Sequence, residues 1–373
     1  MKRLKVLMLV SNLRISNGVS SFAMNYFRHI DHSKIQIDFA LYSDISTPYY
    51  TEIKQCGSKI FILPSIKNIF EHIRRCRNIL SQEKYDIIHD NTLMLSFPMM
   101  FIAKQLNIPV RILHSHNSKL GETALKNIRN RLFMPLLLGV VNHHFACSNL
   151  AGKNMFGNAS YTVIPNVISS KKFNFDIEIR DNIRKKLNIN NKFIVGSVGR
   201  LAYQKNPFFA VDVIVEAKKL IPNLLYWWIG TGSLDNQVKE YIKSKNADKY
   251  IFLLGNRTDV PALYQAMDLF FMPSTFEGLG IVAIEAEATG LPCLVSDTVP
   301  GDISYTDLVS FFSIKEAPAD IAILIQQQKK KIYNRGGYNN ALLESSFSDK
   351  NAGNWVCQEF CVNRFNKQHR IAA

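Results

Sequence analysis

The chain has 373 residues, of which 47% are hydrophobic, and it carries 45 Lys and Arg against 30 Asp and Glu. This length and apolar content exclude a disordered chain and indicate two globular domains. A formal net charge of +15 favours an anionic partner, and no apolar run approaches the roughly 20 residues that cross a bilayer.

The excess of cations is concentrated in the first half of the chain. Residues 1–170 contain 20 Lys and Arg against 9 Asp and Glu, a net charge of +11, whereas residues 171–373 contain 25 against 21, a net charge of +4. A basic first half is typical of contact with nucleic acid, an acidic membrane face or a phosphate-bearing substrate. No stacked-aromatic or recognition motif accompanies the charge, so nucleic acid is not expected as a partner.

Six cysteines are scattered along the chain without CxxC pairs or the spacing of metal ligands. This usage is typical of reduced thiols in the cytoplasm. The N-terminal segment MKRLKVLMLV is short for a signal peptide and has no cleavage-like segment after it, so we interpret it as a first buried strand. The six cysteines are Cys56, Cys76, Cys147, Cys293, Cys357 and Cys361.

Short apolar segments alternate with amphipathic helical patterns through the first half. This alternation predicts a parallel, doubly wound sheet. The expected helices include Ser20–Ile30, Ile69–Glu83 and Leu95–Asn107. The expected strands are Lys5–Val10, Gln36–Tyr42, Lys59–Leu63, Asp86–His89, Val110–His114, His143–Cys147 and Tyr161–Ile164.

A polar, charged stretch at residues 169–191 interrupts the pattern, which then restarts with different residues. The expected helices are Pro207–Leu220, Leu234–Lys245, Val260–Ala266 and Gly280–Ala288. The expected strands are Phe193–Val198, Leu224–Ile229, Tyr250–Leu254, Asp268–Met272 and Cys293–Ser296.

The repeated pattern predicts an α/β protein with two Rossmann-like domains, residues 1–168 and 169–349. Two such domains facing each other would form a cleft, because ligands of these sheets bind beyond the carboxyl ends of the strands. A last helical pattern at residues 350–366 is expected to pack back onto the first domain.

Three glutamates stand in the otherwise apolar segment 273–290, PSTFEGLGIVAIEAEATG. Gly278 and Gly280 form a loop that lets the backbone approach a ligand closely. A helix beginning near Gly280 offers free N–H groups to anions or hydroxyl oxygens. Glu277 stands just before that helix, where it either complements the helix dipole or binds a ligand.

Glu285 and Glu287 lie inside the helix and differ in helical phase. Glu285 shares a face with the apolar Ile281 and Ile284, whereas Glu287 points away from it and is expected to be solvated. A carboxylate on a buried face needs hydrogen-bond donors. Either a pair of sugar hydroxyls or a nearby Lys or Arg would supply them.

Two loops between an expected strand and an expected helix carry features of a phosphate site. The sequence VGRLAYQKNP at 198–207 contains Arg200 and Lys205, which suit a diphosphate because Arg binds oxygens bidentately and Lys adds a point charge. Gly18 lies in the loop SNGVSS at 16–21, before a helix N-terminus that would face the same ligand. Each loop alone is also consistent with ordinary solvated residues.

The segment RILHSHNS at 111–118 ends an expected strand with two histidines. Either imidazole is placed to hydrogen-bond a sugar or to move a proton. His114 and His116 have HxH spacing but no third ligand nearby, so a metal is not expected.

Taken together, these segments resemble the retaining nucleotide-sugar glycosyltransferases of family 4, which have the GT-B fold. The resemblance covers nearly the whole chain, and its most specific part is the E-x7-E motif formed by Glu277 and Glu285. The element VGRL…KNP is the second mark, and Gly18 stands where the family has an N-terminal glycine loop. The chain departs from many members in having one glycine in that loop. The sequences RILHSHNS, IPNVI and FLGNRTDVPALYQAMDLFFMPS are most similar to the branch that builds bacterial capsule and exopolysaccharide.

The resemblance implies a role for each matching residue. Arg200 and Lys205 would bind the donor diphosphate, with Gly18 near it, and Glu285 would take the ribose hydroxyls. The remaining residues would hold the sugar and the base: Glu277 with the backbone of Gly278, Leu279, Gly280 and Ile281 at the donor sugar, His116 (or His114) as the active-site histidine, and Arg257 near the uracil.

The implied reaction transfers a hexose or N-acetylhexosamine, with retention, from a UDP-sugar to a growing polysaccharide on a polyprenyl diphosphate. No cofactor or metal is required, because Arg200 and Lys205 would stabilise the leaving diphosphate. Two alternatives share the fold: a nucleotide-sugar 2-epimerase and a non-catalytic nucleotide-sugar binding protein. The E-x7-E motif together with the two cations argues against both.

The basic first half is consistent with a membrane-bound acceptor. Lys119, Lys126, Arg129 and Arg131 precede the apolar run LFMPLLL at 132–138. A basic segment joined to an apolar one suits the anionic inner face of the plasma membrane, so a cytoplasmic, peripheral protein is expected. A solvated helix followed by a core helix is the alternative.

Overall fold

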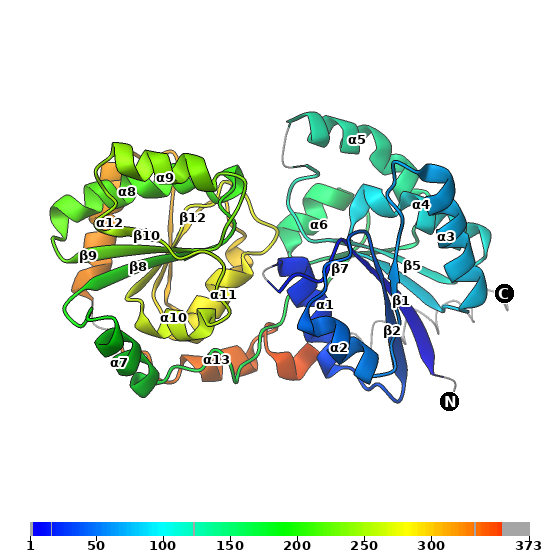
Figure 1. Cartoon of the computed structure of the whole chain (residues 1–373), viewed down its shortest axis with the longest axis horizontal. Helices are drawn as coiled ribbons and strands as arrows, with labels where there is room; N and C mark the ends of the chain where they lie inside the picture. The colour runs from blue at the N-terminus through cyan, green and yellow to red at the C-terminus, as the bar shows by residue number, and fades with distance from the viewer. Residues whose placement is uncertain (1–2, 16, 122–123, 332, 353–373) are drawn as a thin grey trace. The chain divides into compact units, whose positions relative to one another are not determined.

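The computed structural model describes residues 3–15, 17–121, 124–331 and 333–352 (Figure 1). They form two compact units. Unit 1 extends to Val167 and includes the described residues from Asp349 onward, and unit 2 is Ile168–Ser348. The first boundary lies one residue from the division expected from the sequence. The helix expected at 350–366 lies outside the described residues from position 353 onward.

Unit 1 is built on a seven-stranded parallel sheet in the order β3-β2-β1-β4-β5-β6-β7. Its helices are α1 (Gly18–His29), α2 (Pro48–Gln55), α3 (Ile69–Gln82), α4 (Phe97–Gln105), α5 (Ala124–Leu138) and α6 (Asn149–Phe156), with the 3-10 turn η1 (Leu93–Ser96). Its strands are β1 (Leu4–Val10), β2 (Ile35–Leu41), β3 (Ile60–Ile62), β4 (Ile87–Asp90), β5 (Val110–Ser115), β6 (His143–Ala146) and β7 (Thr162–Val163).

Unit 2 has a six-stranded parallel sheet in the order β10-β9-β8-β11-β12-β13, with α8, α9 and α12 on one face and α10 and α11 on the other (Figure 1). Its helices are α7 (Ile177–Lys186), α8 (Pro207–Leu220), α9 (Asp235–Ser244), α10 (Val260–Ala266), α11 (Ile281–Ala288), α12 (Pro318–Lys330) and α13 (Tyr338–Glu344), with the 3-10 turns η2 (Tyr203–Lys205) and η3 (Gly301–Ile303). Its strands are β8 (Phe193–Val198), β9 (Leu224–Ile229), β10 (Ile251–Leu253), β11 (Leu269–Met272), β12 (Cys293–Ser296) and β13 (Val309–Phe312).

Every strand expected from the sequence is present, with ends within one residue of the expectation. The central strands are buried along almost their whole length, as is typical of a parallel sheet covered on both faces. In each sheet the chain leaves the middle in two directions, so a topological switch point lies between β1 and β4 in unit 1 and between β8 and β11 in unit 2. The prediction of two Rossmann-like domains is confirmed.

The expected polar interruption at 169–191 contains a helix, α7. The side chain of Asp176 caps it by accepting hydrogen bonds from the backbone N–H groups of Glu178 and Ile179. Arg184 is buried and binds the Asp268 carboxylate at 3.1 Å and the Ala266 carbonyl at 2.7 Å. Because polar contacts hold this helix in place, apolar periodicity did not predict it.

A buried arginine ties the C-terminal end of α11 to that of α10. Arg335 donates hydrogen bonds to the carbonyl oxygens of Tyr264, Met267 and Thr289 at 3.0, 2.8 and 3.1 Å. These carbonyls lie at the ends of the two helices, where no intrahelical N–H remains to bind them. The contact therefore fixes α11 from the end opposite to its N-terminus.

We expect Arg335→Met to lower the free energy of unfolding of unit 2 by about 3 kcal/mol, because several buried carbonyls lose a charged donor. Urea unfolding followed by tryptophan fluorescence measures it, since Trp227 and Trp228 are buried in β9. Arg257→Met is the control, because Arg257 pairs with Asp259 at the surface, and its free energy of unfolding should stay close to that of the wild type. Equal losses in the two variants would contradict the proposed role of Arg335.

Candidate active site

The strongest candidate site lies at the switch point of unit 2. β8 and β11 are neighbours, and the loops that follow them carry Arg200 and Lys205 on one side and Glu277 on the other. Lys205 Nζ lies 2.7 Å from Glu277 Oε1, and both side chains are largely buried. The structure therefore brings together residues 72 positions apart that the sequence pattern assigned to one site.

Gln204 reinforces the contact between the two loops. Its side-chain Nε2 donates to Glu277 Oε2 at 3.2 Å and to the Phe276 carbonyl at 3.1 Å. Its own carbonyl accepts from the backbone N–H of Thr275 at 2.8 Å. The exposed Arg200 reaches the same amide, with Nη2 3.4 Å from Gln204 Oε1. Gln204 was not among the residues expected from the sequence.

Each of the two loops contains a glycine with positive φ and little space for a Cβ. A Cβ on Gly199 would come 2.9 Å from Lys205 Cε, and Gly199 also has a positive φ of 155°. Gly280 precedes α11 with φ 98°, and a Cβ there would come 3.0 Å from Val299 Cγ1. No side chain caps the first turn of α11. The segment from Gly278 to Gly280 is buried, and two of its three residues have no side chain.

Glu285 lies in an environment that raises its pKa. Burial is the main cause and raises the pKa of the carboxyl to about 7, opposed by the Tyr264 hydroxyl and by the charges of Lys172 and Lys205. The Tyr264 hydroxyl donates to Glu285 Oε2 at 3.2 Å. The expected buried face is only partly observed, because Ile284 is buried whereas Ile281 and Glu285 are half-buried. The charge of Lys205 makes the smallest of these contributions to the pKa of Glu285.

The expectation that Glu287 is solvated is wrong. Its side chain is fully buried, and it accepts hydrogen bonds from the backbone N–H and the hydroxyl of Thr306. Burial raises the pKa of its carboxyl to about 7. The helical wheel assumed one buried face, but α11 also contacts η3 and α13, so its second face is covered as well.

Gly18 begins α1 at the switch point of unit 1. The side chain of Asn17 caps this helix, accepting from the N–H groups of Val19 at 2.9 Å and Ser20 at 3.2 Å. Two of the groups expected to face a phosphate are therefore already bound. A Cβ on Gly18 would meet no atom within 4 Å, so packing does not require glycine at this position.

His116 lies beside the same switch point, at the end of β5. Its Nε2 is 2.7 Å from the Oδ1 of Asn91, which follows β4. Its ring stacks on His114 with centroids 4.0 Å apart, and Phe22 of α1 contacts both rings edge-on. His114 is completely buried, whereas His116 is partly exposed, so the geometry favours His116 for contact with a ligand.

The imidazoles in this cluster are neutral at physiological pH. Burial lowers the pKa of His116 to about 3, with a smaller contribution from the charge of His89. Burial likewise lowers the pKa of His89 to about 3 and holds that of His114 well below its usual value. A neutral imidazole donates one hydrogen bond and accepts another, which suits a hydroxyl ligand better than a phosphate.

The hydrogen bonds of Arg257 do not connect it with the other candidate residues. Its guanidinium forms a bidentate pair with Asp259, at 2.8 and 2.6 Å, on the surface after β10. Among the described residues, no group of three His, Cys, Asp or Glu side chains is placed to hold a metal ion.

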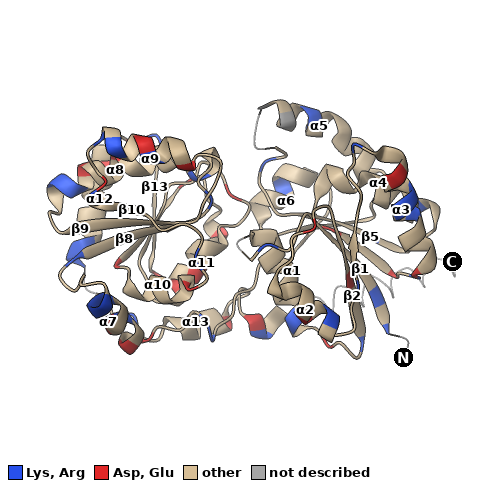
Figure 2. Ribbon diagram, in the orientation of Figure 1, with Lys and Arg blue, Asp and Glu red and all other residues tan. Residues whose placement is uncertain are grey.

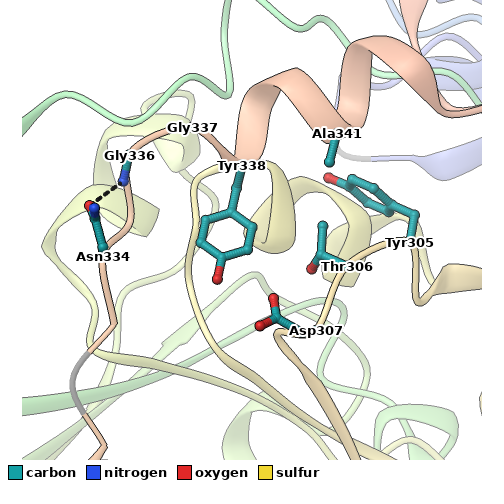
Figure 3. A pocket seen from close by; sticks show the side chains of 8 residues that line it. All are labelled: Tyr305, Thr306, Asp307, Asn334, Gly336, Gly337, Tyr338 and Ala341. Atoms are coloured by element: carbon teal, nitrogen blue, oxygen red, sulfur yellow. Dashed lines mark hydrogen bonds between the residues drawn. The ribbon is translucent and has the colours of Figure 1, made fainter.

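A different hollow, of about 420 Å³, lies between the segments 305–307 and 334–341 of unit 2 (Figure 3). Asp307, Thr306 and the rings of Tyr305 and Tyr338 line it together with Asn334, and its lining contains no Lys or Arg. Segment 305–307 precedes β13, so the hollow lies near the amino end of that strand. An acidic hollow without a cation does not suit a diphosphate.

Sequence reasoning missed Gln204 and Asn91. Both are polar side chains in loops that follow a strand next to a switch point, in the sequences RLAYQKN and IIHDN. That position was the available signal. It becomes decisive only once the order of the strands is known.

Two family profiles together cover most of the chain. Residues 16–172 match Glycosyltransferase Family 4, and residues 179–310 match Glycosyl transferases group 1. EpsF of Bacillus subtilis (strain 168), whose name provisionally places it among the glycosyltransferases, is 28% identical over 306 residues, 79% of this chain and 79% of EpsF.

A second relative and a solved structure agree with this assignment. The UDP-Gal:alpha-D-GlcNAc-diphosphoundecaprenol alpha-1,3-galactosyltransferase of Escherichia coli is 28% identical over 306 residues, 77% of this chain and 78% of the enzyme. The crystal structure of Anabaena Alr3699/HepE in complex with UDP and glucose has the same fold, with a TM-score of 0.80 at 16% identity, over 96% of this chain and 100% of that one. The chain is therefore a glycosyltransferase of the GT-B fold, with a family 4 domain followed by a group 1 domain.

Proposed function

We propose that this glycosyltransferase moves a hexose or N-acetylhexosamine, with retention, from a UDP-sugar to a polyprenyl-diphosphate-linked saccharide. The observation that carries the proposal is the pair Lys205–Glu277, with Arg200 beside it, at the switch point of unit 2. This arrangement places cations for a diphosphate next to a carboxylate for sugar hydroxyls. The Escherichia coli relative is named for UDP-Gal and a diphosphoundecaprenol acceptor, and HepE was solved with UDP and glucose.

The transfer breaks the bond between the anomeric carbon and the phosphate oxygen, and the electron pair stays on the diphosphate. The acceptor hydroxyl forms the new bond on the same face of the sugar, and its proton passes to the leaving diphosphate. Arg200 and Lys205 stabilise the charge that builds on the diphosphate, so the step needs no metal. Glu277 and the backbone of Gly278 to Ile281 hold the sugar.

The proposal also assigns a role to each of the remaining candidate residues. Glu285 accepts hydrogen bonds from the ribose hydroxyls, which favours its ionised form. His116, neutral because its pKa is low, hydrogen-bonds a sugar hydroxyl. Gly18 leaves open space before α1 for the diphosphate, and Arg257 would leave Asp259 to reach the uracil.

The acceptor part of the proposal includes binding of α5 to an anionic membrane surface. Leu125, Ile128, Leu132 and Leu136 form an exposed apolar stripe, and Leu125 is 82% exposed. The buried side of the helix is formed by other residues, including Met134 and Leu137. The apolar run is therefore not simply a core helix. Among the described residues, no helix is long and apolar enough to cross a bilayer.

Cations accompany this apolar stripe. Arg129 and Arg131 lie on α5, which carries blue segments in Figure 2. Beside the helix is a hollow of about 510 Å³, lined by Lys119 and Arg131 and by apolar side chains that include Met134 and Phe156. A hollow lined by both cationic and apolar side chains suits a lipid, with its phosphate at the cations and its acyl or prenyl chain at the apolar side chains.

The donor test is a screen of UDP-, GDP- and ADP-sugars for hydrolysis, followed by transfer to a polyprenyl-diphosphate-linked saccharide. We expect hydrolysis of a UDP-sugar and transfer with retention. Formation of an epimer from the UDP-sugar alone would instead show a 2-epimerase. Absence of turnover with every donor would contradict the proposed function.

We expect Arg200→Ala to lower kcat by about a hundredfold or more, because the diphosphate loses a charged donor in the transition state. Arg200 is exposed, so the melting temperature should not change. Steady-state transfer assays and calorimetry measure the two effects. Near-normal transfer would refute the assigned role.

We expect Lys205→Ala to reduce transfer similarly and also to lower the free energy of unfolding by about 3 kcal/mol, because Glu277 is left buried without its cation. Lys219→Ala is the matched control, since Lys219 pairs with Glu216 on the surface of α8, and it should cost less than about 0.5 kcal/mol. Urea unfolding compares the two. A similar cost in both variants would show that the Lys205–Glu277 pair is not buried as described.

We expect UDP-glucose to bind about three- to tenfold more weakly at pH 6 than at pH 8, because Glu285, with a pKa of about 7, is ionised above that pH and protonated below it. The ribose hydroxyls are donors to the ionised form, so lowering the pH removes their acceptor. Titration calorimetry measures the affinity.

Glu285→Gln should remove this pH dependence of UDP-glucose binding. Glu287→Gln should keep it, although the pKa of Glu287 is also about 7, because its carboxylate binds Thr306 instead. A flat profile in the wild type, or the same profile in Glu285→Gln, would exclude Glu285 as the ribose ligand.

We expect co-sedimentation with phosphatidylglycerol vesicles but not with phosphatidylcholine vesicles. Leu132→Ser/Leu136→Ser should weaken the binding severalfold by removing apolar contact, and Arg129→Gln/Arg131→Gln should remove its dependence on salt. Ile323→Ser changes a comparably exposed residue on α12 and should have no effect. Equal sedimentation with both lipids would refute the membrane proposal.

A further inference from the structure

Gln204 lies between the cation and the carboxylate that the proposed reaction uses. Its Oε1 faces Arg200 Nη2 at 3.4 Å, and its Nε2 faces Glu277 Oε2 at 3.2 Å and the Phe276 carbonyl at 3.1 Å. Guanidinium has only donors, whereas a carboxylate and a carbonyl have only acceptors. These partners fix which end of the amide is oxygen, because the flipped amide would face one donor with a donor and two acceptors with an acceptor.

The backbone of Gln204 is held independently of its side chain. Its carbonyl accepts from the N–H of Thr275 at 2.8 Å and from the Thr275 hydroxyl at 3.2 Å. η2 places residues 203–205 in one tight turn between β8 and α8. A change of the Gln204 side chain therefore leaves the path of the loop intact, and its effects report on the amide.

Lys205 has two competing partners in the proposed reaction. In this structure it pairs with Glu277 Oε1 at 2.7 Å, and in the donor complex it also serves the diphosphate. Each time Lys205 turns toward the phosphate, Glu277 needs another donor to stay oriented. The amide of Gln204, already on the other carboxylate oxygen, is that donor.

We propose that Gln204 is a positioning residue that orients Glu277 toward the donor sugar and Arg200 toward the diphosphate; the proposal rests on the function proposed above. Its neutral amide satisfies a buried acid and a cation at once. A carboxylate in its place would repel Glu277 and would compete with the diphosphate for Arg200.

The test compares Gln204→Leu and Gln204→Glu with the wild-type chain, using kcat at saturating UDP-sugar from pH 5.5 to 8.5. Gln204→Leu should lower kcat about tenfold or more at every pH, because the hydrogen bonds to Arg200 and to Glu277 are both lost. Gln204→Glu should be at least as impaired at pH 8.5. It should recover toward wild type as the pH falls, since a protonated carboxyl can again donate to Glu277 and accept from Arg200.

Gln237→Glu is the matched control, because Gln237 is exposed on α9 of the same unit, and its kcat ratio to wild type should stay near one across the range. Melting temperatures of all variants confirm that each is folded. Wild-type kcat in both Gln204 variants, or equal pH-independent losses in the two, would overturn the proposal. Absence of turnover in the wild type with any nucleotide-sugar would instead contradict the proposed function, and this inference with it.

Discussion

The buried ion pair between Lys205 and Glu277 is the contact on which the candidate site of unit 2 depends. Two charges taken out of water are tolerated only when they are close and further hydrogen-bonded, and here the pair is 2.7 Å apart with Gln204 on the second carboxylate oxygen. Because the pair joins the loops after β8 and β11, it fixes the site where the strand order reverses. The positive φ at Gly199 and Gly280 favours glycine at both positions, and a Cβ would come close to Lys205 at the first and to Val299 at the second.

Unit 1 has the same kind of switch point with different chemistry. Its loops after β4 and β5 bring together Asn91 and His116, and burial keeps the stacked imidazoles neutral. A site of neutral donors and acceptors suits hydroxyl groups, whereas the cations of unit 2 suit phosphate. The two halves of the chain share a topology, and the residues at the strand ends determine what each can bind.

The sequence predicted the sheets well and the polar network only in part. Buried parallel strands are continuous apolar runs such as FIVGSV, so their ends were located to within one residue. Arg200, Lys205 and Glu277 were assigned to one site because charged residues at such strand ends stand out, and the structure brings Lys205 and Glu277 into contact. Glu287 was misplaced, because one helical wheel cannot show that a second face of α11 is covered. The roles of Gln204 and Asn91 depend on which strands are neighbours, and no local sequence pattern predicts the order of the strands in a sheet.

Burying two carboxyl groups of α11 lowers the stability of unit 2, and neighbouring contacts offset part of that loss. Two carboxyls of this short helix, Glu285 and Glu287, have a pKa near 7 because burial disfavours their ionised forms. Each therefore destabilises the fold increasingly as the pH rises from 4.5, the ordinary pKa, to about 7, since the unfolded chain ionises first. Arg335 offsets part of this cost by binding the carbonyls at the C-terminal end of α11 and of α10.

The two glutamates differ in their partners. For Glu287 the hydrogen bonds from Thr306 offset part of the cost of burial. Glu285 has a weaker partner in Tyr264 and lies near the charge of Lys205, and in the proposed donor complex the ribose hydroxyls would complete its hydrogen bonds.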